Sequence, residues 1–330
     1  MKERLSYIDI AKGIGIILVI LSHTDYPELM YYTSPFFVPI FFFCSGYTSS
    51  RKNISLRNCY NRVAIRLLKP YLFFNILLLF IFHDFSLRAI WGIIYSRYCL
   101  FPFGTTQDIC RFMIIGNYPM WFLTCMVVAY LLYEILIYYS KYQYYLIAIY
   151  FLFSTLTTYC PILMPWSLDT APIMAIIMFC ATLIRKEQPQ IFYSQKPHSF
   201  VILSMIFYFL FIPLYNNINI SVRMYGSYIL VYIIAALTGS IIIIYLSRLI
   251  QNTIIGMLIQ RIGMHSLSIF CMEIPFILLG RNIADFFICI YPQLQSPFFI
   301  ASIQLLMALI GGLLLSLLIH KNRYLSKIVF

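Results

Sequence analysis

The sequence predicts an all-α protein: a polytopic bundle of about ten transmembrane helices with both termini in the cytoplasm. Composition is the first observation behind this fold class, because 62% of the 330 residues are hydrophobic and only 10% are charged. Ordinary soluble domains carry roughly 25% charged residues. A soluble domain of this length has too little interior to bury so much apolar surface. The composition therefore excludes a soluble enzyme, a disordered chain and a coiled coil.

The second observation is the length of the apolar runs, because a helix needs about 20 apolar residues to cross a bilayer. We expect spans near residues 8–24, 35–49, 70–84, 119–140, 143–161, 170–184, 199–216, 225–247, 264–281 and 297–319. Residues 85–118 are interrupted by charged residues, Pro and Gly, so we interpret them as a loop with an interfacial or re-entrant helix. No internal repeat or long linker is visible, which predicts a single domain over residues 1–330.

The third observation is the distribution of basic residues, which are enriched in cytoplasmic loops. With the N-terminus inside and ten spans, 18 of the 23 Lys and Arg residues fall inside and five outside. An eleventh span within residues 85–118 would move later basic clusters outside. The net charge of +12 is therefore mostly an orientation signal, and we expect a multi-pass protein whose partner is the lipid bilayer, not nucleic acid.

The nine cysteines have no metal-ligand spacing, and most lie within apolar runs. Free Cys in such runs behaves as a small apolar residue, so we expect neither a metal site nor a disulfide framework. The first apolar run has no small-residue cleavage site, so we expect no cleavable signal peptide.

Ionisable residues within the spans are expensive in lipid and are candidates for function. The first span contains Asp9, Lys12 and His23. Asp9 and Lys12 are i,i+3 neighbours, which fits either an interfacial ion pair or a functional site. His23 lies about 16 Å further along the helix than Lys12 and suits proton transfer near neutral pH, although a structural role at the helix end stays open. Glu273 lies in the middle of a span and is either a site residue or a structural hydrogen-bonding group.

Six segments carry a resemblance to a known family. They are IDIAKGIGIILVILSH (8–23), FVPIFFFCSGY (37–47), RVAIRLLKPYLFF (62–74), YPMWFLTCM (118–126), PWSLDTAPIMAIIMFCATLIRK (165–186) and IGMHSLSIFCMEIPF (262–276). In order and spacing the chain resembles the integral membrane acyltransferases of acyltransferase family 3, and within them the fucose 4-O-acetylase-like group. The first segment is similar to the family's opening motif, with Lys12 and His23 at the motif's basic-residue and His positions.

The chain departs from the family pattern at two positions. Many members have a His where this chain has Phe37, and the family typically has a His where this chain has Glu273. Three interpretations stay open: His23 works alone with Glu273 replacing the second His, the substrate differs, or the protein is a catalytically degenerate member.

The resemblance implies transfer of an acetyl group from cytoplasmic acetyl-CoA to a hydroxyl of a cell-surface glycan or its lipid-linked precursor. It also implies the bacterial cytoplasmic (inner) membrane, an inference to which the missing signal peptide contributes. The acceptor, the acyl chain and the oligomeric state, including a homo-oligomer, are not readable. A polysaccharide-precursor transporter is the alternative class. Transporters often consist of two related halves, and this sequence shows no such internal symmetry.

On this basis the candidate site residues fall into three groups. The catalytic candidates are His23, as general base or transient acyl carrier, Glu273 and Asp9. The expected contacts to the coenzyme A phosphates are Lys12, Arg66 and Lys69. The expected substrate contacts are Ser45, Tyr47, Trp121 and Asp169. For Lys12 and the other basic residues, topology and anionic lipid are an alternative explanation, and Gly13 and Gly15 are expected to serve helix packing.

Overall fold

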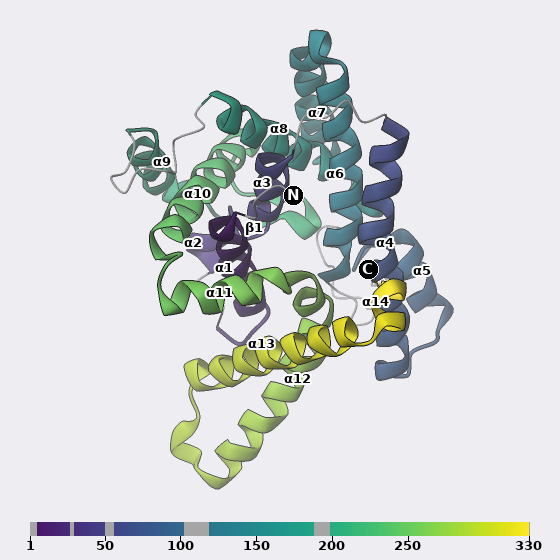
Figure 1. Cartoon of the computed structure of the whole chain (residues 1–330), viewed down its shortest axis with the longest axis vertical. Helices are drawn as coiled ribbons and strands as arrows, with labels where there is room; N and C mark the ends of the chain where they lie inside the picture. Colours follow the sequence, from purple (N-terminus) through teal and green to yellow (C-terminus); the bar gives the residue numbers. More distant parts are fainter. Residues whose placement is uncertain (1–4, 27–29, 50–55, 102–118, 188–198, 330) are drawn as a thin grey trace.

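The computed structural model describes residues 5–26, 30–49, 56–101, 119–187 and 199–329, and it is all-α except for one two-stranded hairpin (Figure 1). The helices are α1 (Ser6–Ser22), α2 (Met30–Thr33), α3 (Pro39–Thr48), α4 (Leu56–Phe82), α5 (Leu87–Tyr95), α6 (Trp121–Tyr138), α7 (Gln143–Thr157), α8 (Ala171–Glu187), α9 (Ser199–Leu210), α10 (Ile229–Ile250), α11 (Ile254–Met264), α12 (Ser266–Ile290), α13 (Pro297–Lys321) and α14 (Arg323–Val329). The strands β1 (Ile218–Asn219) and β2 (Met224–Tyr225) pair antiparallel.

Each predicted span overlaps a helix, in the predicted order, but the helices differ in length. Six are long and apolar enough to cross a membrane: the part of α4 from Ile65, α6, α8 with the turn before it from Pro165, α10, α12 and α13. The helices in the other four predicted spans are shorter, with 17 residues in α1, 10 in α3, 15 in α7 and 12 in α9. The structure thus supports several membrane helices, while the count of ten and the sides of the termini stay predictions.

Helix α1 lies within the bundle and contacts α11, α10, α12 and α3. Glycines bring its backbone close to α11: a Cβ on Gly13 would lie 2.2 Å from the carbonyl oxygen of Ile259, and one on Gly263 would lie 1.8 Å from that of Asp9. A Cβ on Gly15 would lie 2.8 Å from the side chain of Ile40. The predicted packing role of the two α1 glycines is therefore confirmed.

Helices α12 and α13 form an antiparallel pair that extends away from the rest of the molecule (Figure 1). Gly280 and Gly312 stand at their contact, opposite the backbones of Gln304 and Ile269. Much of α13 faces outward with leucines such as Leu314, Leu317 and Leu318. This is the surface expected of a helix that packs on one side and meets lipid on the other.

Residues 85–118 contain the short helix α5, as expected for an interfacial segment. Its apolar side chains Leu87, Trp91 and Ile94 are exposed, whereas Ala89 and Gly92 face the protein. Residues 102–118 lie outside the described part of the chain. Helix α11 and the β1–β2 hairpin were not predicted, and both contribute to the arrangement around the candidate site.

Candidate active site

His23 and Glu273 meet in the structure although 250 residues separate them in the sequence. Nδ1 of His23, at the C-terminal end of α1, lies 3.0 Å from Oε1 of Glu273 in α12. The Glu273 side chain is fully buried, whereas that of His23 is 15% exposed. Within the described residues, neither carboxylate oxygen of Glu273 has a partner in hydrogen-bonding geometry, so the contact with His23 is a close ion-pair approach. A buried carboxylate whose described partner is a histidine is the arrangement that orients an imidazole in general-base catalysis.

His23 faces a cavity of about 60 Å³, which we call the His23 cavity. The other lining residues are Val19, Ser22, Met30, Ser34, Phe37, Val38, Pro119, Trp121, Phe122, Ile218, Asn219, Ile220, Ser221 and Phe270. They come from α1, the α2–α3 region, α6, the β1–β2 hairpin and α12. The cavity is thus lined by apolar and aromatic side chains with a few polar groups, as is usual for small-molecule sites.

Both departures from the family pattern lie around His23. Phe37 lines the same cavity as His23, and Oε1 of Glu273 lies 3.0 Å from Nδ1 of the His23 ring. The two positions at which the resemblance led us to expect a His therefore converge on His23. Glu273 is placed to act on His23 directly.

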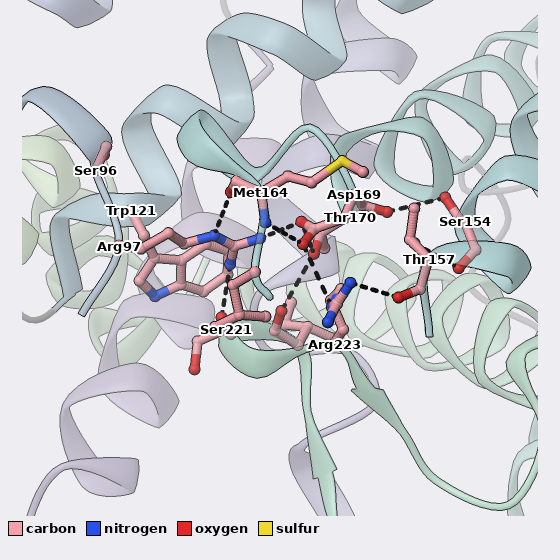
Figure 2. Close-up of polar contacts among 12 residues, drawn as sticks. Ser96, Arg97, Trp121, Ser154, Thr157, Met164, Asp169, Thr170, Ser221 and Arg223 are labelled. Atoms are coloured by element: carbon pink, nitrogen blue, oxygen red, sulfur yellow. Dashed lines mark hydrogen bonds and ion pairs between the residues drawn. The ribbon is translucent and has the colours of Figure 1, made fainter. Parts of the chain in front are cut away.

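Arg97, Asp169 and Arg223 form a buried ion cluster (Figure 2). Arg223 lies between β1 and β2, next to the hairpin residues that line the His23 cavity. Asp169 is fully buried, and its carboxylate pairs with the Arg97 guanidinium and lies 3.3 Å from Nε of Arg223. It also accepts a hydrogen bond of 2.9 Å from the backbone N–H of Met164. Because two arginines share one carboxylate, backbone carbonyls must satisfy their remaining donors.

The carbonyls that the arginines contact belong to the elements around the cavity. Arg97 donates to the carbonyl of Ser221, at 2.6 Å, and Arg223 donates to the carbonyls of Thr157 and Cys160. Ser221 itself lines the His23 cavity. The cluster therefore fixes the hairpin to the ends of α5, α7 and α8. Asp169, expected as a substrate contact, is placed behind the cavity wall, where protein groups engage its carboxylate.

A second cavity of about 160 Å³ lies around Lys12, and we call it the Lys12 cavity. Its other lining residues are Phe41, Ser45, Leu67, Phe122, Leu123, Met126, Ser266, Leu267 and Phe270. Helix α4, which contributes Leu67, also carries the exposed residues Arg66 and Lys69. Nζ of Lys69 donates to the carbonyl of Lys327 at 3.3 Å. Lys12 and Ser45 thus line the same cavity. Arg66 and Lys69, the other two basic residues predicted to contact the donor, lie on α4, which contributes Leu67 to that cavity.

The remaining candidates lie in different places. Trp121 lines the His23 cavity. Tyr47 is buried, stacks on Phe43 and accepts a hydrogen bond of 2.6 Å at its carbonyl from Arg185, and it lines neither cavity. Asp9 is buried on α1 against Gly263. Asp9 precedes His23 by 14 residues, or about 21 Å of helix, so the structure does not bring it together with His23 and Glu273.

Arg97 and Arg223 are the site-supporting residues that sequence reasoning missed. Their signal was present, because they are two of the five basic residues that the orientation count leaves on the outer side. Within the described residues, no group of three or more His, Cys, Asp or Glu side chains is arranged to hold a metal ion.

Comparison with known families decides the class of the protein. Residues 5–321, nearly the whole chain, match the acyltransferase family 3 model described as "Acyltransferase domain". The chain belongs to this acyltransferase family. The family identifies an acyltransferase, and the apolar helices identify a multi-pass membrane protein. Comparisons with curated proteins and with solved structures returned no match.

Proposed function

We propose that this family 3 acyltransferase is a membrane O-acetyltransferase. It moves an acetyl group from cytoplasmic acetyl-CoA to a hydroxyl of a cell-surface glycan or its lipid-linked precursor in the bacterial inner membrane. The observation that carries the proposal is the contact between His23 and the buried Glu273 beside a mostly apolar cavity. Membership of the family supplies the reaction class.

In the proposed reaction His23 is the general base and Glu273 is its positioning residue. When Nδ1–H is donated to the Glu273 carboxylate, Nε2 carries the lone pair that accepts a proton. Nε2 takes the proton of the acceptor hydroxyl while the hydroxyl oxygen bonds to the thioester carbonyl carbon. As the carbon–sulfur bond breaks, the imidazolium returns the proton to the leaving thiolate, giving the ester and free coenzyme A. The carboxylate stabilises the positive charge that the ring carries between these two transfers.

Each cavity takes one substrate in this proposal. Lys12 contributes a cation and Ser45 a hydroxyl to the Lys12 cavity, while Arg66 and Lys69 provide positive charge on the same helix as Leu67 for the coenzyme phosphates. Trp121 offers an aromatic surface in the His23 cavity against which a sugar ring can stack.

The decisive experiment measures release of free coenzyme A from acetyl-CoA by the purified protein in lipid nanodiscs, with candidate glycans as acceptors. We expect His23→Ala to abolish acceptor-dependent release while the protein stays folded. His320→Ala is the matched control, since His320 lies at the C-terminal end of α13, where it contacts Ser316. Undiminished turnover by His23→Ala would refute the assigned base.

The same assay separates the competing classes. A transporter moves labelled glycan across the bilayer without releasing coenzyme A, and a degenerate family member releases none and moves none. Acceptor-dependent release by the wild-type protein is the result that supports the proposal.

A further inference from the structure

The two cavities have a common wall made of two aromatic side chains. Phe122, from α6, and Phe270, from α12, line both the His23 cavity and the Lys12 cavity. Their ring centroids lie 5.1 Å apart and the rings meet edge to face at 61°. Aromatic pairs in this geometry attract each other beyond their simple area of contact. The pair therefore separates the predicted donor side from the general base.

Helix α1 fixes the distance that a donor must cover. Lys12 and His23 lie on this one helix, 11 residues or about 16 Å apart, and each lines a different cavity. A thioester that enters from the Lys12 side must bring its carbonyl carbon to about 3–3.5 Å from the attacking hydroxyl oxygen, beside His23. Its path passes Phe122 and Phe270.

We propose that the Phe122–Phe270 pair is the passage for the acyl thioester and limits the transferable acyl group to a short chain, an inference that rests on the proposed acyltransferase reaction. The His23 cavity, at about 60 Å³, is smaller than the Lys12 cavity, at about 160 Å³, so the acyl group passes from a wider space to a narrower one. An acetyl group adds one methyl to the carbonyl carbon. Each further methylene must displace a ring of the pair as the acyl group passes between the two cavities.

The surroundings of the two rings show which one to alter. Phe122 has edge-to-face contacts with Phe41 and Phe42, at centroid distances of 5.5 and 5.4 Å, and with Trp121. Truncating Phe122 therefore disturbs an aromatic cluster. Phe270 stands on the opposite side of the wall, on the helix that carries Glu273. Truncating Phe270 opens the passage and leaves the contacts of Phe122 with α3 in place.

The test compares acetyl-, butyryl- and hexanoyl-CoA as donors in nanodiscs, with water as the acceptor so that no glycan has to be known. Release of coenzyme A gives kcat/KM for each donor, and the thermal stabilisation of the protein by each donor gives its binding. The variants are Phe270→Ala, the milder Phe270→Leu, and Phe122→Ala. Phe276→Ala is the matched control, because Phe276 lies on the same helix but packs against Gly311 of α13 and lines neither cavity.

We expect the wild-type protein to prefer acetyl-CoA. Truncation at Phe270 should raise the butyryl-to-acetyl ratio of kcat/KM by at least about tenfold, the effect of one or two methylenes in an apolar pocket. Phe276→Ala should keep the wild-type ratio. If Phe270→Ala unfolds, the butyryl-to-acetyl ratio is measured in Phe270→Leu, which removes the aromatic ring but keeps a similar side-chain volume.

Two other outcomes overturn the inference in different ways. A wild type that uses hexanoyl-CoA as well as acetyl-CoA, or an unchanged ratio in folded Phe270 variants, refutes the passage while leaving the acyltransferase intact. A wild-type protein that neither releases coenzyme A nor is stabilised by any donor refutes the proposed function itself.

Discussion

Replacing Glu273 by Gln isolates the charge of the carboxylate from its shape. Glu273 is fully buried and contacts His23 at 3.0 Å, so an isosteric amide keeps the cavity filled and removes the negative charge that faces the imidazole. Without that charge the imidazolium formed during proton transfer is less stable, and the amide no longer selects the tautomer with a lone pair on Nε2.

The structure sets the size of the expected loss. A comparable change in a fully enclosed Ser–His–Asp triad lowers kcat about 10⁴-fold. His23 is 15% exposed, so water partly stabilises its charge, and we expect kcat to fall about 10²–10³-fold, or roughly 3–4 kcal/mol in the activation free energy. Folding should change little, by about 1 kcal/mol or less, because the relief from burying a charge offsets the amide donors left unpaired.

The assay is release of coenzyme A from acetyl-CoA, with kcat and KM for the donor measured separately. A positioning role lowers kcat and leaves KM unchanged. Glu273→His, which introduces the residue that the resemblance leads us to expect at this position, should recover part of the activity. Glu134→Gln on α6 is the control for removing a carboxylate from another membrane helix. Turnover equal to that of the wild type in Glu273→Gln would refute the reasoning.

Three further predictions concern the supports of the site. Asp169→Asn leaves both arginines of the buried ion cluster without a countercharge, so it should lower the free energy of unfolding by about 3–5 kcal/mol in thermal denaturation. The control is Asp285→Asn, which removes a 52% exposed carboxylate from an exposed ion pair. It should change the free energy of unfolding by less than about 0.5 kcal/mol. Gly263→Ala should destabilise the protein by about 1–3 kcal/mol in the same measurement, because its Cβ would lie 1.8 Å from the Asp9 carbonyl oxygen; a stability equal to that of the wild type would contradict this packing. Lys12→Ala should raise KM for acetyl-CoA and reduce its dependence on salt with little change in kcat, and an unchanged KM would remove Lys12 from the donor site.

The apolar pattern predicted where helices form but not how long they are. All ten expected runs overlap helices, because long apolar sequence in lipid has to satisfy its backbone internally. Hydropathy says little about where such a helix stops. The run at 35–49 yields only Pro39–Thr48, and the run at 199–216 ends as a helix at Leu210, three residues before Pro213.

The sequence predicted individual residues of the site but not the contacts between them. His23 and Glu273 were both identified, since ionisable groups in apolar runs are conspicuous, but no local pattern predicts a contact across 250 residues. Arg97 and Arg223 were interpreted as outer-loop charges, because the pairing that explains them depends on how α5, α8 and the hairpin fold around Asp169.

The ends of several helices account for both the short apolar runs and the position of the chemistry. Helix α1 ends at Ser22, next to His23; α3 begins at Pro39, directly after Phe37 and Val38; and α6 begins at Trp121. Residues at all three ends line the His23 cavity. Backbone that leaves helical geometry at membrane depth is tolerated where it is enclosed by protein around a cavity, so these helices stop where the cavity starts. The negative end of the α1 dipole then lies beside the His23 imidazole, where it would stabilise the positive charge that the proposed reaction places on the ring.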